Sequence, residues 1–409
     1  MPVRNPSSLS ASLLLALGLG LCAGPGMGQA VDARSRALHE SLLTLDSHLD
    51  SPMLFGVPGW DILDRHSVAN DGSQLDYPRM VDGGLDGGFF ATYIPQGPLT
   101  DLGRANARDA ALLRLQEIHQ MVAAHPERFE LAYAATDAAR IAASGRRFVY
   151  LSMENGYPLG LDLSLLSTFY KLGVRITGPV HFDNNDLADS STDPKGARWK
   201  GLSPLGKEYV REANRLGMLL DASHASDDVF DQFLELSRTP ILLSHSGVRA
   251  VFDHPRNLDD ARLRRLAASG GVIQISAYSD YMMPKASNPQ RDAALAELRR
   301  AGAAGATPAQ REAQRRKFAE INRQYPSPRA TFDDFMRHLL HAIAVAGIDH
   351  VGIGLDFDGG GGVNGLEDVS DYPKITAALL KAGYSKDDIA KVWSGNVLRI
   401  LAQAQAAAG

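Results

Sequence analysis

Histidines and carboxylates stand at the ends of short apolar runs in this chain, and these residue types hold catalytic metal ions in proteins. The candidate ligands and their neighbours are His48, Asp50, Glu154, His181, His224, His245 and Asp356. Four of the 12 histidines end such a run. Core histidines have no physical reason to gather at the ends of strands, so the joint pattern predicts a metal site.

The ligand types indicate which metal would bind. Imidazole and carboxylate without thiolate suit Zn²⁺, with Mn²⁺, Co²⁺ and Fe²⁺ as alternatives. Three histidines and two carboxylates exceed the three protein ligands of one open catalytic zinc. Two ions about 3.5–4 Å apart, bridged by a shared carboxylate, fit better. Glu154 lies in the chain between the His48–Asp50 pair and the later histidines, and we predict that it is the bridge.

The elements that must position these residues alternate between short β-branched or apolar runs and longer helical patterns. This alternation favours a parallel sheet with crossover helices. The predicted strands are Leu42–Asp50, Gly88–Ile94, Phe148–Glu154, Val174–His181, Met218–His224, Ile241–His245, Val272–Tyr278 and His350–Asp358. Eight strands predict an α/β fold of the (β/α)8 TIM-barrel type, in which active sites form at the C-terminal ends of the strands.

Helical patterns lie between most of these strands, for example at Ala105–Ala124 and Pro204–Leu216. The gap between the seventh and eighth strands is long. Its segment Asp292–Gln324 is rich in Ala, Arg, Glu and Gln, which favour helix. We therefore expect a helical insertion on the rim, either solvated or acting as a lid or dimer contact, followed by an outer helix over Thr331–Ala346. The final residues Ala402–Gly409 are expected to be a frayed helix end.

The first 30 residues differ in composition from the rest. Arg4 is their only charged residue, Leu13–Leu21 is apolar, and small residues precede Ala30. This pattern predicts a cleavable signal peptide over residues 1–30 and a secreted, periplasmic protein whose residues 31–409 form a single barrel domain. Cys22, the only cysteine, would leave with the leader; a lipoprotein anchor at Cys22 is the rival interpretation.

The composition excludes several other classes. The chain of 409 residues is 44% hydrophobic and 22% charged, as in ordinary globular proteins. The formal net charge is −5 and no basic run stands out, so we expect no nucleic-acid partner. After the leader, no apolar stretch is long enough to predict a membrane span.

Several motifs together resemble one known family, the renal (membrane) dipeptidases, a branch of the metal-dependent amidohydrolase-like barrels. The matching segments, in family order, are 46–52 (DSHLDSP), 153–156 (MENG), 181–185 (HFDNN), 221–224 (DASH), 240–246 (PILLSHS), 256–257 (RN), 351–359 (VGIGLDFDG) and 395–399 (GNVLR). They extend over nearly the whole chain after the leader. Ser47 and Leu49 depart from the common family pattern, and the insertion is longer than expected.

The resemblance implies a role for each site residue. It implies one zinc on His48, Asp50 and Glu154, and a second on Glu154, His224 and His245. It further implies that the substrate is held by His181, Arg256, Asp356 and Tyr278. Asp356 would orient or deprotonate the bridging water, and His181 would stabilise the developing oxyanion.

The implied activity is hydrolysis of dipeptides by a metal-bridging hydroxide, with a D-residue at the C-terminal position as an open option. A homodimer is a candidate assembly. Two alternatives stay open. One is another hydrolase of this scaffold, acting on N-acyl amino acids, lactams or phosphoesters; the other is a secreted protein that keeps zinc for structure. We interpret His338 and His341, on the expected outer helix, as structural or solvated.

Overall fold

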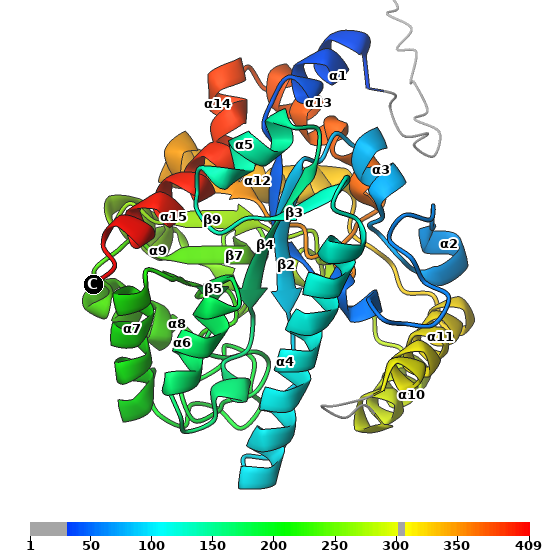
Figure 1. The fold of residues 1–409 in the computed structure, drawn as a ribbon. Coiled ribbons are helices and arrows are strands. Elements are labelled where there is room, and N and C mark those ends of the chain that lie inside the picture. The colour runs from blue at the N-terminus through cyan, green and yellow to red at the C-terminus, as the bar shows by residue number, and fades with distance from the viewer. Residues whose placement is uncertain (1–30, 302–306) are drawn as a thin grey trace, which may run out of the picture. The chain divides into compact units, whose positions relative to one another are not determined.

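Eight parallel strands form the centre of the fold in a computed structural model, which describes residues 31–301 and 307–409 (Figure 1). These strands are β1 (Leu45–Leu49), β2 (Gly87–Thr92), β4 (Arg147–Met153), β5 (Val174–Thr177), β6 (Leu219–Leu220), β7 (Leu242–Val248), β9 (Val272–Ile275) and β10 (Val351–Ile353). They pair in chain order in two sheets, β1-β2-β4-β5-β6 and β7-β9-β10.

Two parallel bridges join the two sheets. Asp221, just after β6, pairs with Leu242 of β7. Phe357, which follows β10, pairs with Leu49 of β1. The circuit of strands is thereby closed, and the predicted (β/α)8 barrel is confirmed.

The strands form because their sequences are buried on both faces, as in parallel sheets covered by helices. Every residue of β4 from Phe148 to Met153 is buried. The covering helices begin at side chains that cap them. Thr100 caps α4 (Asp101–Ala124), and Ser203 caps α7 (Pro204–Leu216), which ends at Gly217 in the left-handed conformation.

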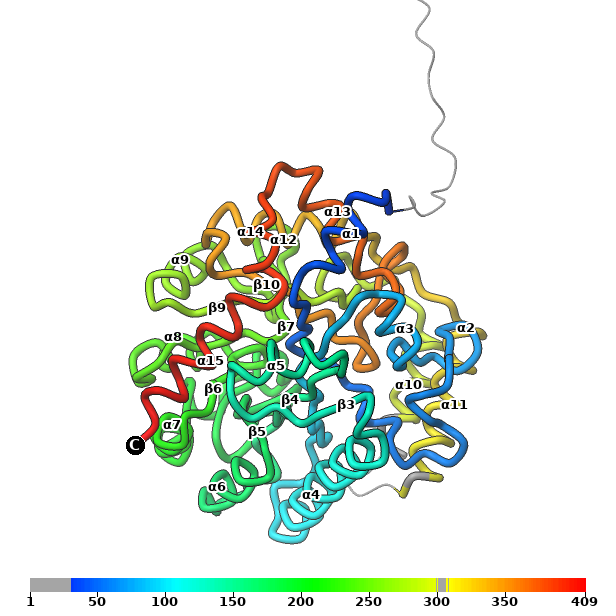
Figure 2. The backbone as a smooth tube through the Cα atoms, turned by 45° about the horizontal axis from the view of Figure 1, so that its top comes forward, coloured from blue at the N-terminus to red at the C-terminus, as the bar shows by residue number. Residues whose placement is uncertain are grey.

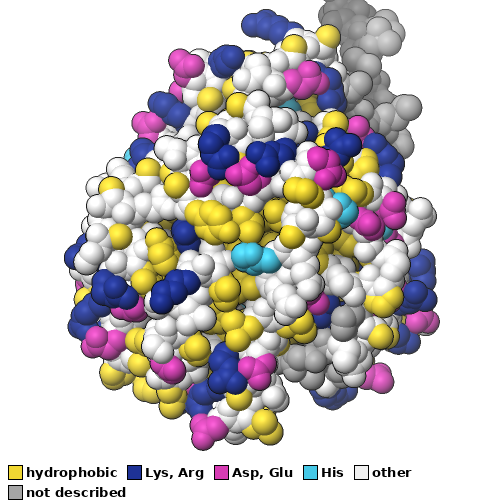
Figure 3. Space-filling view, viewed as in Figure 1, with side chains coloured by type: hydrophobic (Ala, Val, Ile, Leu, Met, Phe, Trp, Pro, Cys, Tyr) yellow, Lys and Arg dark blue, Asp and Glu magenta, His cyan; other side chains and the backbone are white. Residues whose placement is uncertain are grey.

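Further helices surround the barrel (Figure 2). They include α1 (Ala33–Glu40), α3 (Tyr77–Asp82), α5 (Asp137–Ala143), α6 (Ser164–Lys171), α8 (Asp227–Leu236), α9 (Asp260–Ala268), α12 (Phe332–Ala346), α13 (Pro373–Lys381) and α14 (Lys386–Ala390). No helix in residues 31–301 and 307–409 is long and apolar enough to cross a membrane. Basic and acidic side chains are interspersed over the face in Figure 3.

Seven of the eight barrel strands end earlier than the sequence predicts, whereas β7 continues to Val248, three residues past the predicted end at His245. The predicted strand Val174–His181 ends as β5 at Thr177, and the predicted strand His350–Asp358 ends as β10 at Ile353. Two short strands lack a prediction: β3 (Phe129–Leu131), which pairs with β4, and β8 (Asn257–Leu258), which pairs with β7. Most of the chemically interesting residues therefore lie in loops just beyond the strands.

The helical insertion between the seventh and eighth strands of the barrel is confirmed, with different bounds. It consists of α10 (Pro289–Ala301) and α11 (Pro308–Gln324), which lie side by side in Figure 1. Thr307 and Gln310 form a capping box at the start of α11. The insertion begins three residues earlier than predicted, because Pro289 can occupy the first turn of a helix.

The insertion is fastened to the barrel by buried charges. Nη2 of Arg311, on α11, donates to the Phe55 carbonyl at 2.8 Å and to Oε1 of Glu117 on α4 at 2.7 Å. Glu117 also accepts from Arg114 at 2.8 Å, and Arg114 donates to the carbonyl of Pro52. Pro52 belongs to η1 (Ser51–Leu54), the turn that follows β1, so α11 contacts the same short loop as α4.

The prediction of a frayed C-terminal end is wrong for most of that segment. Helix α15 (Asn396–Ala406) crosses in front of the strands in Figure 2 and packs Ile400, Leu401 and Ala404 against them. The backbone N–H of Gly409 donates to the Arg215 carbonyl at 3.0 Å. Burial of these apolar residues and the helix propensity of alanine extend the helix to Ala406.

A buried histidine ties α1 to α13. Nδ1 of His39 lies 2.7 Å from Oγ1 of Thr376, and its Nε2 lies 2.8 Å from the carbonyl oxygen of Gly83. Burial lowers the pKa of His39 from 6.5 to about 4. The folded protein therefore holds this imidazole neutral under conditions in which the unfolded chain would protonate it.

The free energy of unfolding should fall as the pH is lowered through this window. Above pH 6.5 His39 is neutral in both states; between pH 6.5 and about 4 only the unfolded chain binds the proton. His39 alone should remove about 3 kcal/mol over that range. Urea unfolding at several pH values gives the change in the free energy of unfolding with pH, and hence the number of protons taken up on unfolding. Between pH 6.5 and about 4 this number should be smaller by about one for His39→Gln than for the wild type. Equal numbers in the two proteins would contradict the assignment.

Candidate metal centre and active site

Glu154 lies at the centre of the histidine cluster. It directly follows β4, and its Oε1 lies 3.0 Å from Nε2 of His224 and 3.6 Å from Nε2 of His245. The same oxygen lies 3.5 Å from Nε2 of His181 and 3.6 Å from Nε2 of His48. Four imidazoles, from β1, from β7 and from the loops after β5 and β6, thus converge on the carboxylate that the sequence singles out as the bridge.

A second group gathers where β1 and β10 end. Nε2 of His48 lies 3.3 Å from Oδ2 of Asp50 and 4.0 Å from Oδ1 of Asp356. Asp356 has a φ of +64°, a left-handed conformation that aspartate and asparagine tolerate better than most residues. The chain turns at Asp356 instead of continuing β10, and this turn brings its carboxylate beside the β1 residues.

The carboxylates are crowded in a medium that disfavours negative charge. Burial raises the pKa of Glu154 to about 8 and raises the pKa of Asp356 well above its usual range. Burial alone would lower the pKa of His48, but the charges of Asp50 and Glu154 raise it to about 10. The cluster therefore attracts positive charge, which a proton on His48 or a metal cation can supply.

The other three imidazoles are held neutral. Burial lowers the pKa of His181, His224 and His245 well below 6.5, and the nearby Arg256 guanidinium lowers it further. A neutral imidazole keeps the lone pair that a metal ligand needs.

The residues present fit a metal centre. Nε2 of His48, Oδ1 of Asp50 and Nδ1 of His224 are buried without a hydrogen-bond partner in this structure. Three sets of donor atoms each lie within 4.8 Å of one another, namely His48–Glu154–His245, Glu154–His181–His224 and His48–Asp50–Asp356. Unpartnered buried polar atoms are rare in proteins, and coordination of cations would explain those of His48 and Asp50, whereas His224 faces the cluster with its other nitrogen, Nε2.

A cavity borders the cluster on its open side. Its lining residues are Asp50, Met53, Tyr93, Glu154, His181, Phe182, His224, Tyr278, Tyr281, Asp356 and Gly359. The predicted substrate residues His181, Asp356 and Tyr278 are thus at its wall. Two lining residues, Tyr93 and Phe182, were not predicted from the sequence. Their positions could have indicated them, since Tyr93 directly follows β2 and Phe182 is next to His181.

Arg256 lies behind this wall rather than on it. It is 2% exposed, and its Nη2 donates to the His245 carbonyl at 3.0 Å and lies 3.3 Å from Nε2 of His224. Its guanidinium carbon lies 5.0 Å from the ring centroid of Tyr281, which lines the cavity. The structure thus brings Arg256 to the site, between the histidines and the cavity tyrosine.

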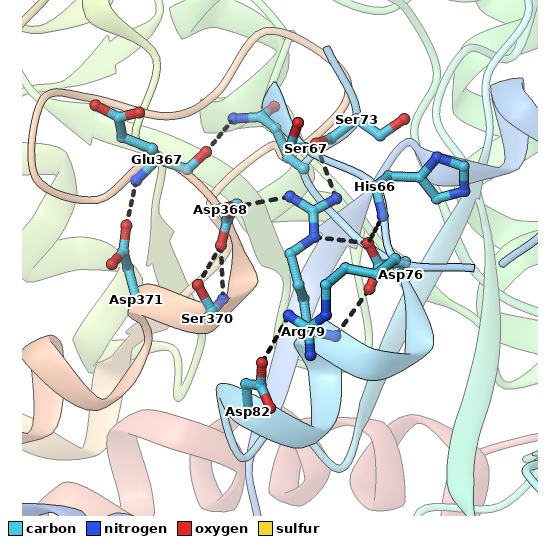
Figure 4. A network of polar contacts seen from close by, with 12 residues as sticks. His66, Ser67, Ser73, Asp76, Arg79, Asp82, Glu367, Asp368, Ser370 and Asp371 are labelled. Atoms are coloured by element: carbon cyan, nitrogen blue, oxygen red, sulfur yellow. Dashed lines mark hydrogen bonds and ion pairs between the residues drawn. The ribbon is translucent and has the colours of Figure 1, made fainter. Parts of the chain in front are cut away.

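The loop that carries Asp356 is braced from outside the barrel. Asp358 accepts from the Gln74 backbone N–H at 2.7 Å and from Ser51 Oγ at 2.5 Å. Gln74 in turn donates to the Glu367 carbonyl at 2.8 Å. Figure 4 shows the network around Glu367 and Asp368, in which Arg79 binds both Asp76 and Asp368. These contacts hold the loops after β1 and β10 against each other.

Gly359 allows the two loops to approach. A Cβ atom at this position would lie 2.0 Å from Oδ2 of Asp50 and 2.3 Å from Oδ1 of Asp356, which no real contact permits. We expect Gly359→Ala to displace these carboxylates and lower kcat/KM on the order of 100-fold. Gly395→Ala is the control, since its Cβ would meet its nearest atom at 3.4 Å. Comparable activity of the two variants would contradict the prediction.

A parallel barrel with buried histidines and carboxylates converging at the C-terminal strand ends defines a metal-dependent hydrolase. The family model for membrane dipeptidases (peptidase family M19) matches residues 32–409. The chain belongs to this family of metallopeptidases, and the family suggested by the motifs is confirmed.

Individual relatives agree with this assignment. The chain is 31% identical over 368 residues to dipeptidase tcpJ of Claviceps purpurea, covering 88% of this chain and 76% of the relative. It resembles the crystal structure of the probable dipeptidase PvdM from Pseudomonas aeruginosa, with 34% identity, a TM-score of 0.77, and coverage of 92% and 98% of the two chains. A metallopeptidase from Rhodobacter sphaeroides, solved with a phosphinate mimic of the dipeptide L-Ala-D-Ala, has 26% identity, a TM-score of 0.67, and coverage of 88% and 98%.

Proposed function

We propose that this protein is a dizinc dipeptidase that hydrolyses the peptide bond of free dipeptides. The observation that carries the proposal is the convergence of four imidazole Nε2 atoms within 3.0–3.6 Å of one oxygen of Glu154. The ligand sets are those of the sequence prediction: His48 and Asp50 at one ion, His224 and His245 at the other, and Glu154 at both. Zinc bound here would supply an activated water and would polarise the scissile carbonyl.

Two residues at the cavity wall would carry out proton transfer and stabilisation of the developing negative charge. Asp356 is placed to take a proton from the attacking water and pass it to the leaving amine. His181, held as a neutral imidazole, can donate a hydrogen bond to the oxygen on which negative charge develops. The protein scaffold keeps both groups fixed, since Asp356 and His181 are 8% and 7% exposed.

Recognition of the substrate's ends distinguishes a dipeptidase from an endopeptidase. We propose that the positive charge of Arg256, close behind the cavity wall, attracts the terminal carboxylate of the dipeptide. Tyr278 at the wall would contact the same end. The D-Ala in the mimic bound by the Rhodobacter sphaeroides relative supports acceptance of a D-residue at that position.

The location of the protein is part of the proposal. The charge and hydropathy pattern of residues 1–30, which lie outside the described residues, supports export to the periplasm and cleavage after Ala30. Detection of Val31 as the N-terminus of the exported protein would test it. The homodimer stays a prediction.

One experiment tests the activity. Zinc-loaded protein should hydrolyse L,L- and L,D-dipeptides, chelation should abolish hydrolysis, and added Zn²⁺ should restore it. Dipeptides with amidated C-termini should be poor substrates, since the carboxylate is lost. Preference for N-acyl amino acids, lactams or phosphoesters would favour the alternative hydrolases, and full activity in metal-free protein would refute the metal mechanism.

A further inference from the structure

Asp221 binds two serines that adjoin predicted zinc ligands. It follows β6, is 4% exposed, and its Oδ1 accepts from the Ser223 backbone N–H at 3.0 Å and from Ser223 Oγ at 2.6 Å. Oδ1 also accepts from the Ser244 backbone N–H at 2.9 Å, and Oδ2 accepts from Ser244 Oγ at 2.5 Å. Each serine directly precedes a predicted zinc ligand, His224 or His245.

The proton on Ser244 determines what this hydroxyl can do for His245. A serine hydroxyl has one proton, and at 2.5 Å from a carboxylate oxygen that proton is donated to Asp221. Ser244 Oγ also lies 2.9 Å from Nδ1 of His245. Since the hydroxyl proton is committed to Asp221, Oγ accepts at this contact and Nδ1 carries the proton.

The opposite nitrogen of His245 then faces the metal site with its lone pair. In a neutral imidazole only one nitrogen is protonated, so an Nδ1–H ring leaves Nε2 free to act as a ligand. Nε2 of His245 is the atom 3.6 Å from Oε1 of Glu154 and 2.9 Å from Nε2 of His224. Hydrogen bonds to the far nitrogen of a ligating histidine commonly fix its ring and tautomer.

We propose that Asp221 is a positioning residue that acts through Ser244 to hold His245 in the tautomer and orientation required for metal binding. The proposal rests on the dizinc function and goes beyond it, since it assigns a task to two residues that are not themselves ligands. The two histidine ligands differ in this respect: Nδ1 of His245 contacts Ser244, whereas Nδ1 of His224 is buried without a hydrogen-bond partner in this structure.

Ser223 provides a matched comparison. Its hydroxyl also donates to Asp221, and it accepts the His245 backbone N–H at 3.1 Å. Ser223 and Ser244 are both buried, at 4% and 0% exposure. No hydrogen bond between the Ser223 hydroxyl and an imidazole nitrogen is found in the described part of the chain. The two hydroxyls also lie 3.1 Å apart, so loss of either removes this contact and one bond to Asp221. Loss of the Ser223 hydroxyl removes a bond to the His245 backbone, whereas only loss of the Ser244 hydroxyl removes the contact to the His245 ring.

The test is the zinc dissociation constant of the full-length protein, measured by competition with a chelating dye. Ser244→Ala should weaken zinc binding by about 10- to 100-fold, and Ser223→Ala should change it by less than about threefold. Asp221→Asn should weaken zinc binding about as much as Ser244→Ala. Because both residues act through one contact, the double variant should bind zinc no more weakly than the weaker of the two single variants. Circular dichroism and thermal unfolding of metal-free samples verify folding.

Histidine-labelled NMR of the metal-free protein gives an independent readout. The His245 ring should show the Nδ1–H tautomer in the wild type and in Ser223→Ala, and a shift toward the other tautomer in Ser244→Ala. Wild-type zinc affinity in Ser244→Ala, equal losses in the two serine variants, or additive effects of Asp221→Asn and Ser244→Ala would overturn the positioning role. Absence of zinc binding in the wild type would instead refute the dizinc function, and the positioning role with it.

Discussion

Glu154→Gln should lose bound zinc and lower kcat/KM for dipeptides on the order of 10³-fold or more. Oε1 of Glu154 lies within 3.6 Å of all four clustered imidazoles, so one substitution affects both halves of the centre. Glutamine keeps the size of the side chain but replaces one ligating oxygen by an NH₂ group and removes the negative charge. Elemental analysis of the purified variant, with hydrolysis of a dipeptide, measures the effect.

The stability of the metal-free variant separates loss of metal from loss of fold. Burial raises the pKa of Glu154 to about 8, so near neutral pH the folded metal-free protein holds this carboxyl protonated while the unfolded chain releases the proton, which lowers the free energy of unfolding. Metal-free Glu154→Gln should therefore unfold at the same or a higher temperature than the metal-free wild type. Glu235→Gln, at an exposed position on α8, is the control and should keep zinc and activity. A Glu154→Gln protein with full zinc content would contradict the bridging assignment.

Asp356→Asn should lower kcat by about 10²- to 10⁴-fold while zinc content and KM stay near their wild-type values. The side chain borders the cavity, and asparagine cannot take the proton that the mechanism assigns to Asp356. Asparagine is also the substitution that fits the backbone, because the φ of +64° would strain most other residues. Steady-state kinetics with elemental analysis tests the prediction.

Asp358→Asn is the matched control for this variant. Asp358 has a φ of +66° and is partly buried, but it binds Ser51 and Gln74 instead of lining the cavity. Its substitution should lower the melting temperature and change kcat at least about tenfold less than Asp356→Asn. If Asp356→Asn also lost zinc, Asp356 would be a metal ligand rather than the proton acceptor.

The sequence predicts the barrel well because its strands are buried on both faces. Continuous apolar runs such as Phe148–Met153 have no other stable place than the centre of a parallel sheet. Active sites of this barrel type form at the C-terminal ends of the strands, and this indicates where the histidines and carboxylates meet. The family motifs add the division of ligands between two ions, which periodicity and composition leave open.

Strand ends and supporting residues were harder to predict, because tertiary contacts decide them. Asp356 leaves the strand direction through a left-handed turn that depends on contacts with the loop after β1. Asp221 stands in a recognised motif, yet its task depends on Ser244, 23 residues later in the chain. The order in the C-terminal helix comes from packing of Ala404, which composition alone does not reveal.

The anchor of the insertion has a consequence for engineering chimeric enzymes. Trimming α10 and α11, or exchanging them for another rim segment, would delete Arg311 and leave Glu117 with Arg114 as its remaining arginine partner among the described residues. The carboxylate of Glu117 and the carbonyl of Phe55 would each lose a hydrogen bond from a charged donor, and such bonds contribute about 1.5–3 kcal/mol each. A graft that also exchanges the Glu117 segment of α4, or supplies a new donor to it, should therefore be more stable than one that exchanges the insertion alone.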